Sequence, residues 1–249
     1  MPRASSARWR EGPLSDSELS ALLEAGRVAP ERTEAYGPHE DQVVDFYGES
    51  GPGPDIAVVH GGFWRQEWDR GHLTPFASAL AARGMRVALI EYRRVGDGGG
   101  WPQTAEDVQA ALDLLGAPPA VLLGHSAGGQ LALHAAAVRE RAAARVLTYG
   151  AVADLQRAWE LRLSEGAAAA FLGRAAGPET WAAADPMRLL PRVPVELLHG
   201  TADTDVPLEL SRRYANNWGA RLHLLPGSGH FAALVPHTPA FGVLARMLA

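Results

Sequence analysis

The chain contains no cysteine among its 249 residues. Disulfide bonds, thiol nucleophiles and thiolate metal sites are therefore all excluded. Histidine, aspartate and glutamate remain as strong metal ligands, but no H-x-x-x-H pattern or carboxylate cluster occurs at ligand spacing. Catalysis must use hydroxyl, imidazole or carboxylate groups, and the sequence predicts neither a metal nor a cofactor.

Long hydrophobic runs and an excess of basic charge are also missing. No stretch of about 18 residues is continuously apolar, and the N-terminal residues around Arg3, Arg8 and Arg10 lack the apolar core of a secretory signal. We therefore expect a cytoplasmic protein with no membrane association. The net charge is -5 and basic residues are scattered, so we expect no nucleic acid partner. The expected partner is a small-molecule substrate, and the oligomeric state, a homodimer included, stays open.

Short apolar stretches typical of strands alternate with stretches of helical periodicity along most of the chain. Such alternation favours parallel pairing, because a crossover helix ordinarily joins neighbouring parallel strands. The predicted fold class is α/β, with a mostly parallel sheet, helices on both faces and a single domain over residues 1–249. Residues 154–190 interrupt the alternation with Ala-rich helical sequence and predict a small helical cap. Near the N-terminus, Ser15 and Glu18 have capping-box spacing and predict a short helix. The predicted strands are 42–47, 56–59, 86–90, 120–123, 146–149, 195–198 and 222–225, and the other predicted helices are 76–83, 105–115, 130–138, 208–218 and 240–248.

A candidate nucleophile follows the predicted strand 120–123. There the run Gly124 to Gly128 reads G-H-S-A-G and leads into a predicted helix, which is the context of a nucleophile elbow. Small residues on either side of Ser126 allow a strained turn that exposes the serine hydroxyl at the edge of the sheet. The backbone amide of Ala127 would then stand at a helix N-terminus, where negative charge is stabilised.

Candidates for the base and the acid follow later in the chain, in the order that this fold requires. A serine hydroxyl needs an imidazole to take its proton, and the imidazole needs a carboxylate to orient it. Asp203 comes just after one predicted strand and His230 just after the next. Asp205, in the same loop as Asp203, is an alternative acid, although we prefer Asp203, and His237 is a weaker alternative base.

The run His60 to Trp64, HGGFW, ends the predicted strand 56–59. A tetrahedral intermediate needs two or three backbone donors, and paired glycines let the main chain approach closely. We assign the amides of Gly62, Phe63 and Ala127 to this oxyanion hole. Trp64 is a candidate for the substrate-binding pocket, since an aromatic wall suits a flat apolar substrate group.

These motifs resemble those of the α/β-hydrolase superfamily of serine hydrolases over nearly the whole chain. Within that superfamily, the HGGFW run together with G-H-S-A-G looks like the pattern of kynurenine formamidase (arylformamidase) and related small esterases, and residues 42–47 are similar to that family's early strand. Phe63 stands where formamidases often have tyrosine. The resemblance implies metal-free hydrolysis of N-formylkynurenine to kynurenine and formate.

Three functions follow as hypotheses. The first is a serine hydrolase that cleaves a small aryl formamide or ester through an acyl-enzyme at Ser126. The second is a carboxylesterase with another acyl preference. The third is a non-catalytic binding protein on the same fold, because a fold does not determine a function.

Overall fold

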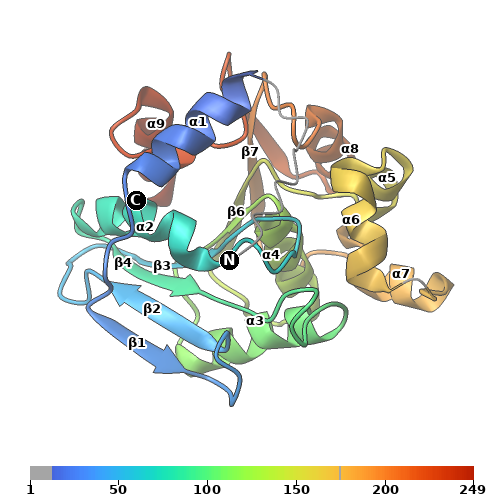
Figure 1. The fold of residues 1–249 in the computed structure, drawn as a ribbon, viewed down its shortest axis with the longest axis horizontal. Coiled ribbons are helices and arrows are strands. Elements are labelled where there is room, and N and C mark those ends of the chain that lie inside the picture. The colour runs from blue at the N-terminus through green and yellow to red at the C-terminus, as the bar shows by residue number, and fades with distance from the viewer. Residues whose placement is uncertain (1–12, 174) are drawn as a thin grey trace, which may run out of the picture.

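The fold is known from a computed structural model that describes residues 13–173 and 175–249. Within these residues, eight strands form one sheet in the order β1-β2-β4-β3-β5-β6-β7-β8 (Figure 1). From β4 to β8 all neighbours are parallel, whereas β1 and β2 are antiparallel to their neighbours. The predicted α/β class with a mostly parallel sheet is confirmed. The strands are β1 Arg32–Ala35, β2 Val43–Tyr47, β3 Asp55–Val59, β4 Arg86–Ile90, β5 Val121–His125, β6 Arg145–Tyr149, β7 Val195–Gly200 and β8 Arg221–Leu225.

Helices cover both faces of the sheet, and a separate hydrophobic cluster fills each layer. In β3, Ala57 and Val59 belong to one cluster while Ile56 and Val58 belong to the other, because successive side chains of a strand point to opposite faces. The first cluster includes residues of α3, α4 and α8, and the second includes residues of α1, α2 and α9. The helices are α1 Pro13–Glu24, α2 Thr74–Ala81, α3 Gln103–Leu114, α4 Ala127–Val138, α5 Leu155–Glu160, α6 Leu163–Leu172, α7 Pro178–Ala184, α8 Leu208–Trp218 and α9 Pro239–Leu248, with short 3-10 turns η1 Arg70–Leu73, η2 Pro186–Arg188 and η3 Ala232–Leu234.

Two local expectations need correction. Strand β1 was not predicted, because all four of its residues are exposed and no apolar alternation marks it. Helix α1 begins at Pro13, so Ser15 lies inside the helix and cannot be its N-cap residue. The carboxylate of Glu18 accepts hydrogen bonds from the backbone amides of Gly229 and Phe231.

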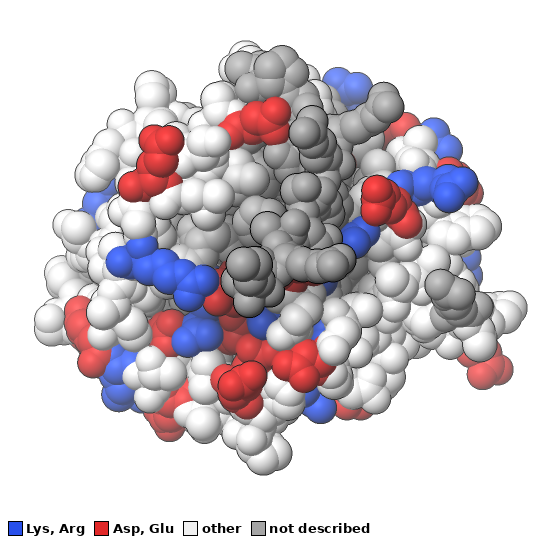
Figure 2. Space-filling view, in the orientation of Figure 1, with Lys and Arg blue, Asp and Glu red and all other residues white. Residues whose placement is uncertain are grey.

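Helices α5, α6 and α7 lie together at one side of the molecule (Figure 1). They occupy most of residues 154–190, and the described part of that range contains no strand. On the face drawn in Figure 2, acidic and basic side chains of the described residues are intermixed. No described helix is both long enough and apolar enough to cross a membrane.

Candidate active site

Ser126 occupies a strained turn between β5 and α4. Its φ and ψ are 54° and -119°, a region that non-glycine residues rarely adopt. The glycines beside Ser126 allow the backbone to pack closely around the turn. A Cβ on Gly124 would stand 2.4 Å from the carbonyl oxygen of Gly128, and one on Gly128 would stand 2.2 Å from that of Val59. Ser126 is buried and lines a cavity of about 40 Å³ that His230 also lines.

His230 and Asp203 form a buried imidazole–carboxylate pair. The Nδ1 atom of His230 lies 2.7 Å from Oδ2 of Asp203, and the two side chains are 2% and 0% exposed. The other carboxylate oxygen of Asp203 accepts the backbone N–H groups of Asp205 and Val206 at 3.0 and 2.8 Å. Gly150 packs against the pair so closely that a Cβ there would lie 2.9 Å from Nδ1 of His230. The orientation of the imidazole is therefore set from several sides.

Electrostatics within the pair favour an ionised carboxylate and a basic imidazole. Burial alone would raise the pKa of Asp203, but the charges and hydrogen bonds of His230 and His199 hold that pKa well below its ordinary value. For His230, burial lowers the pKa, and the Asp203 carboxylate with smaller contributions from Asp205 and Glu18 reverses this, so that the net pKa is raised. An imidazole of this kind can accept a proton from a neighbouring hydroxyl.

The two alternatives from the sequence, Asp205 and His237, do not make the hydrogen bond described above. Asp205 lines the cavity, but the hydrogen bond to His230 comes from Asp203. His237 is not among the described residues that line this cavity. Asp203, Asp205 and His230 have potential metal-ligand atoms within 4.8 Å of one another. Of these groups, His230 and Asp203 share the hydrogen bond at Nδ1.

The HGGFW run lies beside the elbow and lines the same cavity. Gly61 approaches the elbow closely, since a Cβ there would lie 2.8 Å from Cβ of Ser126. Gly62, Phe63 and Trp64 have positive φ values of 107°, 48° and 59°, so the loop is held in a left-handed conformation over three residues. Gly62 and Phe63 line the cavity. The N–H of Ala127, first residue of α4, has no acceptor within its own helix.

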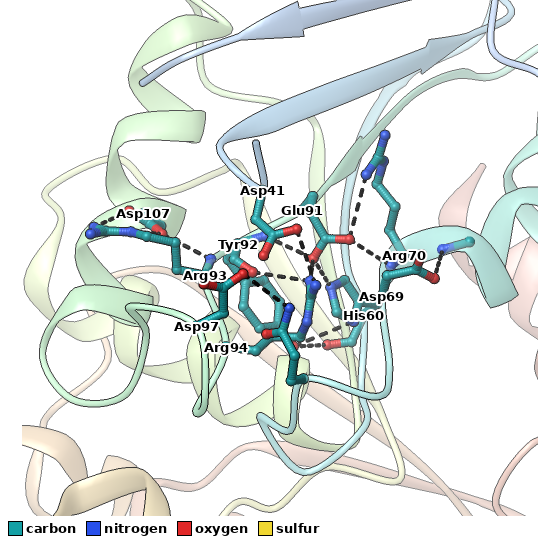
Figure 3. Close-up of polar contacts among 12 residues, drawn as sticks. Asp41, His60, Asp69, Arg70, Glu91, Tyr92, Arg93, Arg94, Asp97 and Asp107 are labelled. Carbon is teal, nitrogen blue, oxygen red and sulfur yellow. Dashed lines mark hydrogen bonds and ion pairs between the residues drawn. The ribbon is translucent and has the colours of Figure 1, made fainter. Parts of the chain in front are cut away.

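A buried polar network holds the start of this loop (Figure 3). The carboxylate of Glu91, 0% exposed, lies 2.8 Å from Nε2 of His60 and accepts the backbone N–H of Arg70 at 2.8 Å. It also pairs with the guanidinium of Arg94. The ring of His60 stacks on Tyr92, whose hydroxyl donates to the carbonyl oxygen of His60 at 2.8 Å. This network was missed in the sequence, where its signal is an acidic residue directly after the apolar strand β4.

Trp64 does not lie where the sequence analysis placed it. Its side chain is 1% exposed, stacks on Phe171 with ring centroids 4.4 Å apart, and donates to Oε1 of Gln130 at 3.2 Å. The left-handed backbone at Trp64 accompanies this inward side chain. Among the described residues, the tryptophan that lines the cavity is Trp68, four residues further along the chain.

Comparisons with known proteins agree with this architecture. Residues 56–241 match the model of the Alpha/beta hydrolase family. Among solved structures, the chain is similar to a putative thioesterase from Silicibacter sp., with a TM-score of 0.74 and 19% identity over 98% of this chain and 97% of that one. It is also similar to Esterase B from Lactobacillus rhamnosis, with a TM-score of 0.73 and 19% identity over 94% and 89% of the two chains.

A third similar structure is an acetyl ester-xyloside bifunctional hydrolase from Caldicellulosiruptor lactoaceticus, with a TM-score of 0.69 and 20% identity over 88% of this chain and 94% of that one. A comparison with curated proteins finds no match. At these identities the solved structures establish a shared fold. The family match covers well over half of the residues, and the chain therefore belongs to the alpha/beta hydrolase family.

Proposed function

We propose that the protein is a serine esterase that hydrolyses small carboxylic esters through an acyl-enzyme. One observation carries this proposal: a buried His230–Asp203 pair with a 2.7 Å hydrogen bond shares a cavity with Ser126 on a strained elbow. The chain order Ser126, Asp203, His230 is that of an acyl-transfer triad in this fold, which supports the proposal. The esterases among the similar solved structures support the same reaction class.

In the proposed reaction, the hydroxyl oxygen of Ser126 attacks the ester carbonyl while the free Nε2 of His230 accepts its proton. Asp203 holds the opposite nitrogen as N–H and stabilises the imidazolium that forms. The imidazolium then protonates the departing alcohol oxygen, and the acyl group remains on Ser126. A water molecule, deprotonated by His230, releases the acid and restores the serine.

The negative charge of each tetrahedral intermediate falls to backbone amides. We assign this role to Ala127, at the N-terminus of α4, and to Gly62 and Phe63, which line the cavity. The loss of one such donor typically slows acyl transfer by roughly 10²–10³-fold. The loop around His60 therefore needs the rigid support that Glu91 gives it.

A small acyl group fits the cavity best. Its volume of about 40 Å³ is well below the roughly 300–1,000 Å³ of typical ligand pockets. Phe63, Trp68 and Phe231 supply an aromatic lining. We further propose that the chain is one domain in which helices α5 to α7, within residues 154–190, act as a cap.

A second candidate is hydrolysis of an aryl formamide such as N-formylkynurenine. The observation that favours it is the aromatic lining of so small a cavity, since formyl is the smallest acyl group and an aryl group would contact Phe63, Trp68 and Phe231. Ester and formamide share the same Ser126 chemistry. The two candidates differ in the leaving group, which is an alcohol in one and an aromatic amine in the other.

The deciding experiment compares rates on p-nitrophenyl esters of increasing acyl length with the rate on N-formylkynurenine. We expect kcat/KM to fall steeply beyond short acyl groups. A fluorophosphonate probe should label wild-type protein and leave Ser126→Ala unlabelled. If folded wild-type protein is not labelled and cleaves neither substrate class, the proposed catalysis is wrong and a binding protein on this fold is the better description.

A further inference from the structure

The carboxylate of Glu18 bonds to the backbone on both sides of His230. Its Oε1 accepts the N–H of Gly229 at 2.9 Å, and its Oε2 accepts the N–H of Phe231 at 3.0 Å. The contact is close, since a Cβ on Gly229 would lie 2.6 Å from Oε2 of Glu18. One side chain therefore holds both amides that flank the imidazole-bearing residue.

Glu18 comes from α1, which precedes the residues matched by the family model. The helix is nevertheless tied to the body of the protein. Leu22 is 0% exposed within the hydrophobic cluster of that face, and Leu19 lines the same cavity as Ser126.

The segment after α1 attaches to a second part of the cavity lining. Arg27 pairs with Asp69 at 2.9 Å, and the N–H of Val28 donates to Oγ1 of Thr74 at 3.0 Å. These partners flank η1, the turn whose His72 lines the cavity. Residues 18–28 thus link the His230 loop to the η1 wall.

We propose that Glu18 is a positioning residue for His230, fixing the loop that presents the imidazole to Ser126. This proposal rests on the proposed function. Two charge-assisted hydrogen bonds to adjacent amides restrain the loop more strongly than neutral ones would. Because acyl transfer depends on the geometry between hydroxyl and imidazole, a displacement of about 1 Å can reduce the rate roughly 10²-fold.

Glu18 also acts on His230 through its charge. The charged groups around the imidazole are Asp203 and Asp205 from the loop after β7 and Glu18 from α1, and the negative charge of each raises the pKa of His230. Two further imidazoles face the same site. Burial holds the pKa of His72 at about 4 and that of His125 well below 6.5, so neither is charged where His230 titrates.

Three variants test the proposal. Glu18→Gln keeps the size of the side chain but removes the charge and one acceptor. Glu18→Asp keeps the charge but is too short to reach both amides. Glu24→Gln is the matched control, because Glu24 is an exposed glutamate near the end of the same helix. Rates are measured per active site, titrated with the fluorophosphonate probe, so that misfolded protein does not contribute.

We expect Glu18→Gln to lower kcat about tenfold to a hundredfold relative to Glu24→Gln, with KM nearly unchanged. The acid limb of its pH–rate profile should move to lower pH, and NMR titration should show the same direction for the His230 imidazole. Glu18→Asp should lose kcat without that shift. If Glu18→Gln does not fold, kcat of Glu18→Asp decides.

The proposal is overturned if both Glu18 variants match Glu24→Gln in kcat. It is also overturned if folded Glu18→Gln keeps the kcat of Glu24→Gln and only its His230 pKa moves, since Glu18 would then act through its charge and not by positioning. Failure of the proposed function is a different result: wild type and Glu24→Gln would themselves be inactive and unlabelled.

Discussion

Replacing Glu91 with glutamine tests the support of the HGGFW loop. The substitution changes almost no volume but removes a negative charge at a position that is 0% exposed. The carboxylate lies 2.8 Å from Nε2 of His60, accepts the backbone N–H groups of Arg70 and Tyr92, and pairs with Arg94, whose side chain is 4% exposed. A glutamine would present an N–H₂ group to one set of these donors and leave Arg94 with Asp41, 3.0 Å away, as its ion-pair partner.

Two estimates of the stability loss agree. Breaking a buried ion pair by neutralising one partner costs about 3–5 kcal/mol. Independently, burial raises the pKa of Glu91, but His60, Arg94 and the Arg70 amide lower it further, to about 2 against the ordinary 4.5. At about 1.4 kcal/mol per pKa unit, this difference corresponds to about 3 kcal/mol of folding stability at neutral pH. Because the folded-state pKa is depressed, this stability is present above pH 4.5 and is lost as the pH falls from about 4.5 toward 2.

Thermal and urea denaturation measure the effect. For a chain of this length, a loss of about 3 kcal/mol lowers Tm by roughly 6–12 °C. The control is Asp55→Asn, which breaks the exposed pair with Arg86 and should change Tm little. The gap between wild type and Glu91→Gln should narrow as the pH is lowered below 4.5. Equal Tm values for the two variants, or a gap independent of pH, would refute the reasoning.

Three further outcomes follow from the site. Asp203→Asn should lower kcat by roughly 10³–10⁴-fold, because the imidazole loses its orienting acceptor, whereas Asp205→Asn should keep most of the activity. If steady-state kinetics show the larger loss for Asp205→Asn, Asp205 is the acid. Since the pKa of His230 is raised and only neutral imidazole accepts the Ser proton, kcat/KM should fall with decreasing pH around a midpoint above 6.5; a midpoint below 6.5 would contradict this. Trp64→Ala should lower the free energy of unfolding in urea by about 3–5 kcal/mol and leave KM of the folded protein unchanged. Trp68→Ala should change KM with a smaller loss of stability. If instead Trp64→Ala changes KM and Trp68→Ala does not, Trp64 belongs to the pocket.

The sheet was predictable from sequence wherever burial imposed a pattern. Strands from β2 to β8 carry apolar residues that two hydrophobic clusters require on opposite faces. Strand β1 contributes no residue to either cluster, because its four residues are exposed, and its backbone pairing with β2 makes it a strand. The start of α4 at Ala127 was also misplaced by three residues, since the elbow is followed by glycines that no helix propensity favours.

The candidate site was predictable to the extent that it follows strand ends. Ser126, Asp203 and His230 each come just after a parallel strand, and parallel strands end at one edge of the sheet. Trp64 and Trp68 could not be told apart in this way. They belong to a loop with positive φ at Phe63 and Trp64, where side-chain direction follows neither the helical nor the strand period.

Glu18 and Glu91 escaped sequence analysis for a physical reason. Both carboxylates accept hydrogen bonds from backbone amides, and a backbone amide leaves no residue-type signal at the partner position. Glu18 is also 211 and 213 positions away from its partners, so no local spacing links them. Yet the elbow alone cannot determine the distance between hydroxyl and imidazole, because the imidazole sits on a separate loop. The HGGFW loop thus depends on Glu91 and the His230 loop on Glu18, and neither carboxylate takes part in the proposed reaction. Glu18 comes from α1, which lies outside the residues matched by the family model.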